Sequence, residues 1–229
     1  SQNGIFIAQE AKEELRKILG EKAKEITILR VNLFNPINSK KNQDEIEIIY
    51  SLPVFLSLAI ASGPEIKDEI KRIFEKFETF FVEKENVLNM EFSKLFLNLI
   101  GMATATRGLK IKEGFKNKEI LKEEIFALKE YIRVVKAFGG KFLNFPFSPV
   151  NFFANLVDFL PFFVFFIFKD FLIKFIEKKR EEKVKELSEI KYYNGLVVNL
   201  GKKLKIETPV NERILKRGLE FLESGRTPI

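Results

Sequence analysis

The 229-residue sequence contains no cysteine, no histidine and no tryptophan. The absence of cysteine excludes disulfide bonds and thiol nucleophiles, so nothing in the composition indicates an oxidising compartment. The absence of histidine removes the imidazole general base, and without either residue the common zinc-ligand sets are excluded. Any acid–base chemistry must therefore come from Lys, Asp, Glu or Tyr, and no metal site is expected.

The excess of lysine and arginine gives a formal net charge of +7, which would suit nucleic acid, an anionic membrane or an anionic substrate. The basic residues are mostly interleaved with glutamate, as in EKKREEKVKE at 177–186, which predicts a solvated surface of mixed charge. The 26 phenylalanines lie in apolar runs, so no stacking platform for nucleic acid is expected. A Lys/Glu-rich chain with two Met is also typical of hot environments, although AT-rich coding enriches Phe, Ile and Lys as well.

The first residues, SQNGIFIAQE, lack the basic region and the apolar core of a signal peptide, and they begin without Met. We therefore expect a cytoplasmic protein, and a chain that begins inside a longer one.

The first 62 residues predict a short helix and two strands. The apolar spacing over 8–19 ends at Gly20, as in a helix with a glycine stop. The β-branched runs 25–33 and 45–52 flank a charged, turn-forming segment, which predicts that they pair as a β-hairpin. Because two strands alone are marginal in water, we expect this hairpin to belong to the edge of a sheet lying mostly outside the chain.

From Ser62 onward the apolar spacing is helical, so we divide the chain into 1–62 and an all-helical domain, 63–229. Pro64 and Glu65 mark a helix start, and Thr208 is expected to cap the last helix with Pro209 in its first turn. The expected helices between these two cover 90–106, 117–137 closed by two glycines, and 180–204.

A phenylalanine-rich stretch at 145–176 allows more than one interpretation. Its uninterrupted apolar run, 159–168, is about half of the ~20 residues that a membrane-spanning helix needs, and Pro161 breaks it. We expect a buried or interface helix pair, covered by a partner such as a second copy of the chain. A membrane anchor at 150–176 stays an alternative, which behaviour as a soluble protein without detergent would exclude.

The helix expected at 90–106 carries the strongest chemical signal from spacing. Lys94 and Asn98 are four residues apart and so share one face, while nearly every neighbour is apolar. A surface helix has a broad polar side, so this narrow stripe predicts a mostly buried helix with an amine and an amide facing a cleft. A lysine there can donate a proton or pair with an anion, although a lysine at the edge of a core helix would look the same.

The segment SKLFLNLIGMATA at 93–105 resembles the helix of ketopantoate reductases that reads W-x-K-L-x-x-N. The resemblance implies that Lys94 is the general acid that protonates the substrate carbonyl oxygen as hydride arrives, and that Asn98 binds substrate. The family often has another Asn four residues further on, where this sequence has Met102.

The segment SEIKYYNGLVVNLGKKLKIETPVNERI at 188–214 resembles the closing signature of the same family, [ST]-E-x-D-x-x-N-G followed by a P-x-N. The family glutamate, which contacts substrate hydroxyl groups, falls on Glu189, and the aspartate two residues later is replaced by Lys191. The Ser-rich or Gly-Lys-rich loop that the family has before this glutamate is replaced by EKKREEKVKEL.

A third match is Gln2-Asn3-Gly4, since the family carries an Asn-Gly near the nicotinamide, which implies a cofactor contact for Asn3. The resemblance implies a mainly α fold: a helical domain like the C-terminal domain of 6-phosphogluconate dehydrogenase, after a short helix and a β-hairpin from a Rossmann-type domain. It implies an NADPH-dependent reductase of 2-dehydropantoate, a small anionic 2-oxo acid, in pantothenate biosynthesis. No G-x-G-x-x-G occurs, so NADPH would be bound mainly outside this chain, which alone is expected to be inactive.

A different function is compatible with the same residues. The missing Ser loop, Met102 and Lys191 would also fit a non-catalytic helical interaction or dimerisation module derived from the family, with the phenylalanine-rich stretch as its partner surface. A strictly monomeric protein that binds no other protein would argue against the module.

Overall fold

The computed structural model describes residues 4–35, 37–42, 45–177 and 184–224. The chain forms two compact units. One consists of Phe6–Glu91 with Phe145–Ser148, and the other of Phe92–Asn144 with Gly4, Ile5 and the described residues from Pro149 onward. All strands of the described residues lie in the first unit and the second is helical, so the expected mainly α fold is confirmed. Residues 63–91, which we had grouped with the helical domain, belong to the first unit because they supply one of its strands.

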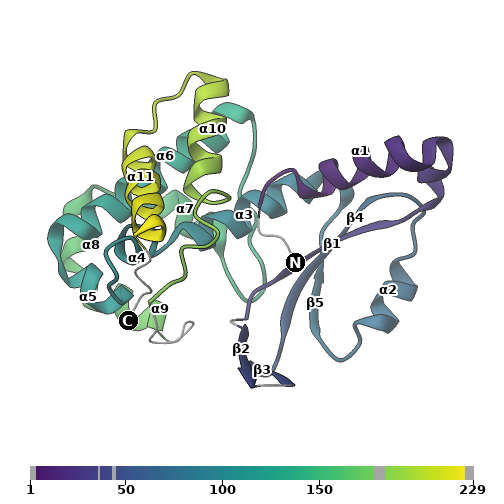
Figure 1. The fold of residues 1–229 in the computed structure, drawn as a ribbon, viewed down its shortest axis with the longest axis horizontal. Helices are drawn as coiled ribbons and strands as arrows, with labels where there is room; N and C mark the ends of the chain where they lie inside the picture. The colour runs from purple at the N-terminus through teal and green to yellow at the C-terminus, as the bar shows by residue number, and fades with distance from the viewer. Residues whose placement is uncertain (1–3, 36, 43–44, 178–183, 225–229) are drawn as a thin grey trace. The chain divides into compact units, whose positions relative to one another are not determined.

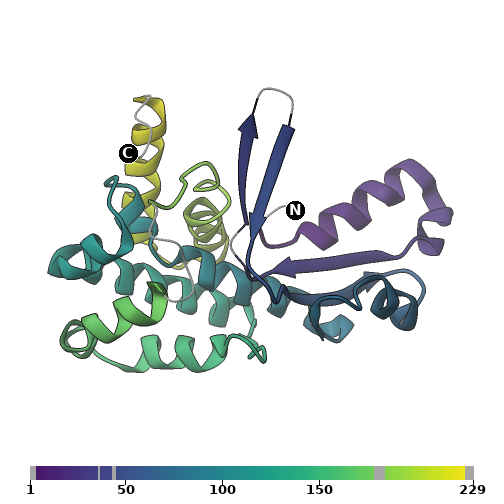
Figure 2. The ribbon, with the colours of Figure 1, turned by 90° about the horizontal axis from the view of Figure 1, so that it is seen from below.

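The first unit is built on a three-stranded sheet of order β1-β4-β5 (Figure 1). Strand β4 is central because it is buried on both faces, and it pairs antiparallel with β1 and parallel with β5. Helices α1 and α2 lie on opposite faces of this sheet (Figure 2). The bounds are α1 Ile7–Leu19, η1 Gly20–Glu25, β1 Ile28–Leu33, β4 Phe55–Ser62, α2 Lys67–Ile73 and β5 Glu78–Phe81.

The expected hairpin between 25–33 and 45–52 is wrong. Strand β1 pairs with β4, which the sequence did not predict, and β3 (Glu45–Tyr50) pairs instead with β2 (Ile37–Asn42). The reason is burial: β4 offers apolar side chains to both faces of the sheet, whereas every residue of β3 is exposed. The stronger partner for β1 is therefore the strand that completes the core.

The second unit is organised around α6 (Lys118–Phe138), which contacts α3 (Val87–Leu99) through Tyr131 and Phe138 and packs against at least six further helices. The Asn117 side chain accepts hydrogen bonds from the amides of Glu119 and Ile120 and so caps its first turn. Gly139 ends the helix with a left-handed φ of 84°, which confirms the glycine stop. The contacting helices are α4 Met102–Ala105, α5 Ile111–Lys116, α7 Val150–Phe159, α8 Phe162–Ile167, α10 Asn194–Leu204 and α11 Pro209–Glu223.

The phenylalanine-rich stretch forms three short helices, α7, α8 and α9 (Lys169–Glu177), where we expected a pair. Pro161 lies at the N-cap of α8 and separates it from α7. Within the described residues, no helix has both the length and the apolar character needed to cross a membrane. The helices keep large apolar side chains exposed, namely Phe152, Phe159, Phe163, Ile167, Phe168 and Phe171.

Two helices differ from the sequence-based expectation in their bounds, and one expected cap is not formed. The helix expected over 90–106 is broken at Gly101, whose φ is 88°, and the long helix expected over 180–204 begins only at Asn194, after a turn-rich segment. Pro209 is the first residue of α11, as expected, but the Thr208 side chain makes no capping hydrogen bond. Periodic apolar spacing continues through these turns because their side chains also face the core, so spacing alone overestimates the helix length.

Candidate functional site

Helix α3 (Val87–Leu99) carries Lys94 and Asn98 one turn apart on the same face. Both side chains are half-buried, and the expectation of a mostly buried helix is confirmed by the neighbours that pack into the core. The fully buried members are Met90, Glu91, Phe92, Ser93, Leu95, Phe96 and Leu99. The helix therefore presents one narrow polar face, with an amine followed by an amide.

The C-terminal end of this helix is fixed by a buried carboxylate from α6. Glu124 accepts hydrogen bonds from the backbone of Gly101 (3.1 Å) and from both the amide (2.8 Å) and the hydroxyl (2.9 Å) of Thr104. Burial raises the pKa of Glu124 above its ordinary value, and the hydrogen bonds from Thr104 oppose that rise. The break between α3 and α4, and with it the position of Asn98, is thus set by a group in the core.

Lys185, which the sequence did not single out, lies against the same helix end. Its Nζ donates to the backbone carbonyl of Asn98 and to that of Ile100 (3.1 Å). The ammonium group also lies 5.4 Å from the centroid of the Tyr193 ring, within the range of a cation–π contact. These contacts tie the segment before α10 to the last turn of α3.

Glu189 is connected to Lys185 by Tyr193, which contacts both residues. The Tyr193 hydroxyl donates to Oε2 of Glu189, one helical turn earlier in the chain. Tyr193 is 4% exposed, whereas Glu189 is half-buried. The structure therefore links Glu189, through Tyr193 and Lys185, to the end of the helix that carries Lys94 and Asn98.

Much of the C-terminal signature holds helices together. The Asn194 side chain donates to Asn211 (2.9 Å), and Asn211 donates in turn to Glu130 of α6 (2.8 Å). Glu130 also accepts from the amides of Val210 and Asn211, so it caps the start of α11. These signature residues pack α10 and α11 against α6, whereas Glu189 and Tyr193 are linked through Lys185 to the end of α3.

The other positions that we compared with the ketopantoate reductase motifs have different surroundings. Met102 is fully buried at the start of α4, so this position belongs to the core. Lys191 is exposed, two residues after Glu189 in the chain. Asn3 lies outside the described residues, so its assignment stays an expectation. Within the described residues, no group of three or more acidic side chains could hold a metal ion.

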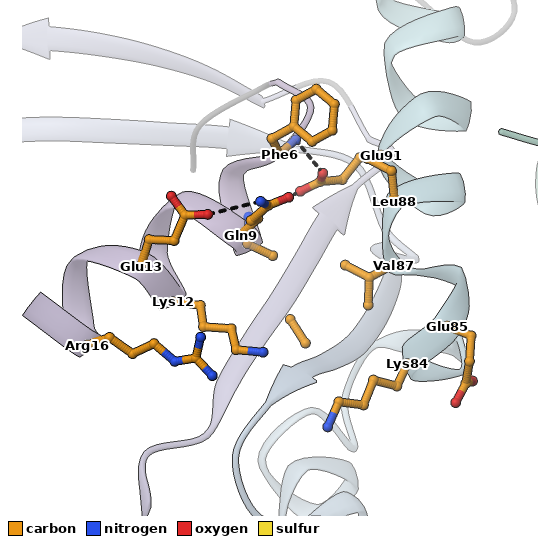
Figure 3. A pocket seen from close by; sticks show the side chains of 12 residues that line it. Phe6, Gln9, Lys12, Glu13, Arg16, Lys84, Glu85, Val87, Leu88 and Glu91 are labelled. Carbon is orange, nitrogen blue, oxygen red and sulfur yellow. Dashed lines mark hydrogen bonds between the residues drawn. The ribbon is translucent and has the colours of Figure 1, made fainter. Parts of the chain in front are cut away.

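The first unit contains a groove of about 390 Å³ between α1 and the start of α3 (Figure 3). Lys12 and Lys84 point toward one another across it, and Glu91 closes one end. Glu91 accepts hydrogen bonds from the Phe6 amide (2.8 Å) and the Ala8 amide (3.4 Å), at the start of α1. The groove is formed by none of the residues that the sequence analysis selected.

A buried ion pair supports this groove. Arg30 Nε donates to Oε1 of Glu91 over 2.8 Å, and the two side chains are 9% and 1% exposed. Burial raises the pKa of Glu91, and the Arg30 charge acts against that rise. Glu91 therefore takes, at the Phe6 and Ala8 amides, the place that a bound anion would have at the start of a helix.

Comparison with known proteins identifies the class of this architecture. Residues 86–217, more than half of the chain, match the family described as "Ketopantoate reductase PanE/ApbA C terminal", a family of NAD(P)H-dependent 2-oxo acid reductases. The chain therefore belongs to the PanE/ApbA ketopantoate reductase family. A search of curated protein sequences found no match.

Solved structures share this fold at low sequence identity. The PanE/ApbA family ketopantoate reductase from Ralstonia eutropha JMP134 is 16% identical, with a TM-score of 0.67, over 97% of this chain and 65% of its own. D-mandelate dehydrogenase with NADH and anilino(oxo)acetate is 13% identical, with a TM-score of 0.65, over 97% of this chain and 66% of its own. A dimeric ketopantoate reductase from Staphylococcus aureus is 15% identical, with a TM-score of 0.52, over 86% and 62%. The chain thus spans less than two thirds of the length of these structures.

Proposed function

We propose that this chain supplies the proton donor and the substrate-binding side chains of an NADPH-dependent 2-oxo acid reductase, which converts 2-dehydropantoate to pantoate in the cytoplasm. The observation that carries the proposal is the polar face of α3, where a half-buried lysine precedes an amide by one turn in an otherwise buried helix. The linkage of Glu189 to the end of that helix supports it further. Family membership supports the reaction class and leaves the substrate to be tested.

The chemistry divides among three side chains. Reduction adds a hydride to the carbonyl carbon and a proton to the carbonyl oxygen, and the Lys94 ammonium is the proposed donor of that proton. In this proposal the Asn98 amide hydrogen-bonds the same substrate, and Glu189 accepts from a substrate hydroxyl. The neutral Lys94 amine then regains a proton from solvent.

The nicotinamide cofactor supplies the hydride when it is bound. This chain can supply only part of the cofactor site. The sequence has no phosphate-binding G-x-G-x-x-G, and the Phe6 and Ala8 amides at the start of α1 already donate to Glu91. We therefore assign its phosphates to other residues, and propose Asn3 as the one contact from this chain. The chain alone is proposed to be inactive.

The experiment is an assay of the full-length protein with NADPH or NADH and a panel of 2-oxo acids that includes 2-dehydropantoate and phenylglyoxylate. We expect NADPH oxidation to be fastest with 2-dehydropantoate. Turnover of phenylglyoxylate alone would keep the reaction class and overturn the substrate. No oxidation with any 2-oxo acid would favour the alternative of a non-catalytic helical module.

The exposed phenylalanines on α7–α9 favour self-association, whether the protein is the proposed reductase or a non-catalytic helical module. We propose a homodimer through this surface. The dimeric Staphylococcus aureus relative supports a second copy of this chain as the partner that covers it. Phe163→Glu is expected to raise the dimer dissociation constant by roughly 30-fold or more, the effect of losing an interface anchor of about 2 kcal/mol.

Light scattering over a range of concentrations measures this change. Ile73→Glu is the matched control, because Ile73 is 70% exposed on α2, outside the α7–α9 surface. A monomeric wild-type protein, or equal effects of the two substitutions, would contradict the proposed interface.

A further inference from the structure

We propose that Tyr193 is the positioning residue for Glu189, and that Lys185 anchors both against the helix that carries Lys94 and Asn98. This inference rests on the proposed function, because Glu189 is assigned there as a substrate ligand. It adds two residues that the sequence analysis did not select.

The backbone and the buried ring hold Tyr193 in place independently of its hydroxyl. It lies at the N-cap of α10, and its backbone amide donates to the carbonyl of Glu189 (3.1 Å) and of Ile190 (3.3 Å). Its ring is almost fully buried, so few other rotamers are accessible. The hydroxyl then reaches Oε2 of Glu189 from a fixed direction.

The bond to Tyr193 limits the motion of a side chain that is flexible by itself. Glutamate has three rotatable bonds, and ordering it on substrate binding costs conformational entropy. A hydrogen bond from a phenol to a carboxylate is charge-assisted and stronger than a neutral one. An ionised carboxylate can accept about four hydrogen bonds, so the phenol orients Glu189 without using all of its capacity to bind.

Lys185 connects this pair to α3. Its ammonium lies over the Tyr193 ring and donates to the carbonyls of Asn98 and Ile100, at the negative end of the helix dipole. The buried carboxylate of Glu124 lies close enough to interact with the same charge. One cation thereby fixes the spacing between the residue that orients Glu189 and the helix end at Asn98.

Tyr193→Phe removes only the hydroxyl and keeps the ring under Lys185. In the full-length protein, we expect this variant to raise KM for 2-dehydropantoate about tenfold while kcat stays within about threefold, since the loss affects binding of substrate rather than proton transfer. KM for NADPH and the melting temperature should stay unchanged. Tyr192→Phe is the matched control, because the neighbouring Tyr192 is 59% exposed.

A double-mutant cycle tests whether Tyr193 acts through Glu189. Glu189→Gln should raise KM on its own, and adding Tyr193→Phe should then cost less than about twofold more, because the two residues form one unit. Lys185→Met should impair both kcat and KM, with the exposed Lys191→Met as its control.

The outcomes separate the two proposals. If Glu189→Gln leaves KM unchanged, the role of Glu189 in the proposed function is wrong. If Glu189→Gln raises KM but Tyr193→Phe does not, or if the two effects simply multiply, the positioning role of Tyr193 is wrong. A melting temperature lowered equally by Tyr193→Phe and Glu189→Gln, with unchanged KM in both, would mean that the pair is only structural.

Discussion

Replacing Lys94 with alanine is expected to lower kcat for the 2-oxo acid by about 10²–10⁴-fold, the contribution typical of a positioned general acid. The substitution removes the proton donor, so negative charge on the developing alkoxide is no longer neutralised as hydride arrives. KM should change much less, because Asn98 and Glu189 remain to bind the substrate. Lys94 is half-buried at the edge of the core, so we expect stability to change little.

The measurement is steady-state NADPH oxidation by the full-length variant, compared with Lys191→Ala as a control for the loss of a positive charge near Glu189. Lys191 is exposed, and its substitution should leave kcat within about twofold, as for most surface sites. Undiminished kcat in the Lys94 variant would remove its assigned role. A fall in kcat with a parallel loss of melting temperature would indicate a packing role instead.

Replacing Glu91 with alanine is expected to destabilise the first unit by about 3–5 kcal/mol, the cost of leaving one partner of a buried ion pair without its counter-charge. Arg30 would be left with its guanidinium in a site where it is 9% exposed. The amides of Phe6 and Ala8 would lose their acceptor as well, which weakens the start of α1.

Denaturant unfolding gives the change in free energy, with Glu85→Ala as the control because Glu85 is an exposed carboxylate on the same groove. The double variant Arg30→Met, Glu91→Leu should be more stable than Glu91→Ala, because it removes both charges and fills the site. A cost below about 1 kcal/mol for Glu91→Ala would show that Arg30 finds water or another acceptor, and that the pair is not important for stability.

The helices could be predicted where spacing and stop signals agree. The span of α6 agrees with the expected 117–137, and Gly139 ends the helix as expected, whereas the cap by Asn117 was not predicted. The strand pairing could not be predicted, because the choice between β3 and β4 as the partner of β1 depends on which strand is buried on both faces. Burial of that kind is a property of the assembled unit and leaves a weak signal in the local sequence.

The candidate site was only partly visible in the sequence. The narrow polar stripe of Lys94 and Asn98 was read from helical spacing, whereas Glu189 was selected only through resemblance to a family. Lys185 reaches the carbonyl of Asn98 across 87 positions of the chain, and no local pattern predicts such a contact. The four-residue spacing of Glu189 and Tyr193 was visible, but a glutamate–tyrosine pair is ordinary until the tyrosine proves to be buried.

The C-terminal signature also gains a physical explanation. Gly201 is needed because a Cβ there would lie 2.8 Å from the Ile206 carbonyl oxygen, a backbone atom that cannot rotate away. The Asn194 side chain donates to that of Asn211, which in turn donates to Glu130 of α6. A match to this signature therefore indicates mostly how helices pack around α6, and activity has to be tested at Lys94, Asn98 and Glu189.

The central claim, that this protein reduces a 2-oxo acid with a proton from Lys94, is tested most directly by following the transferred hydrogen. The full-length protein would be supplied with NADPH deuterated at the reactive position and with 2-dehydropantoate, and the product examined by mass spectrometry and NMR. The account predicts pantoate with one deuterium at C2, and loss of this product in the Lys94→Ala variant. Absence of labelled 2-hydroxy acid from the wild-type protein, or an equal yield from the variant, would contradict it.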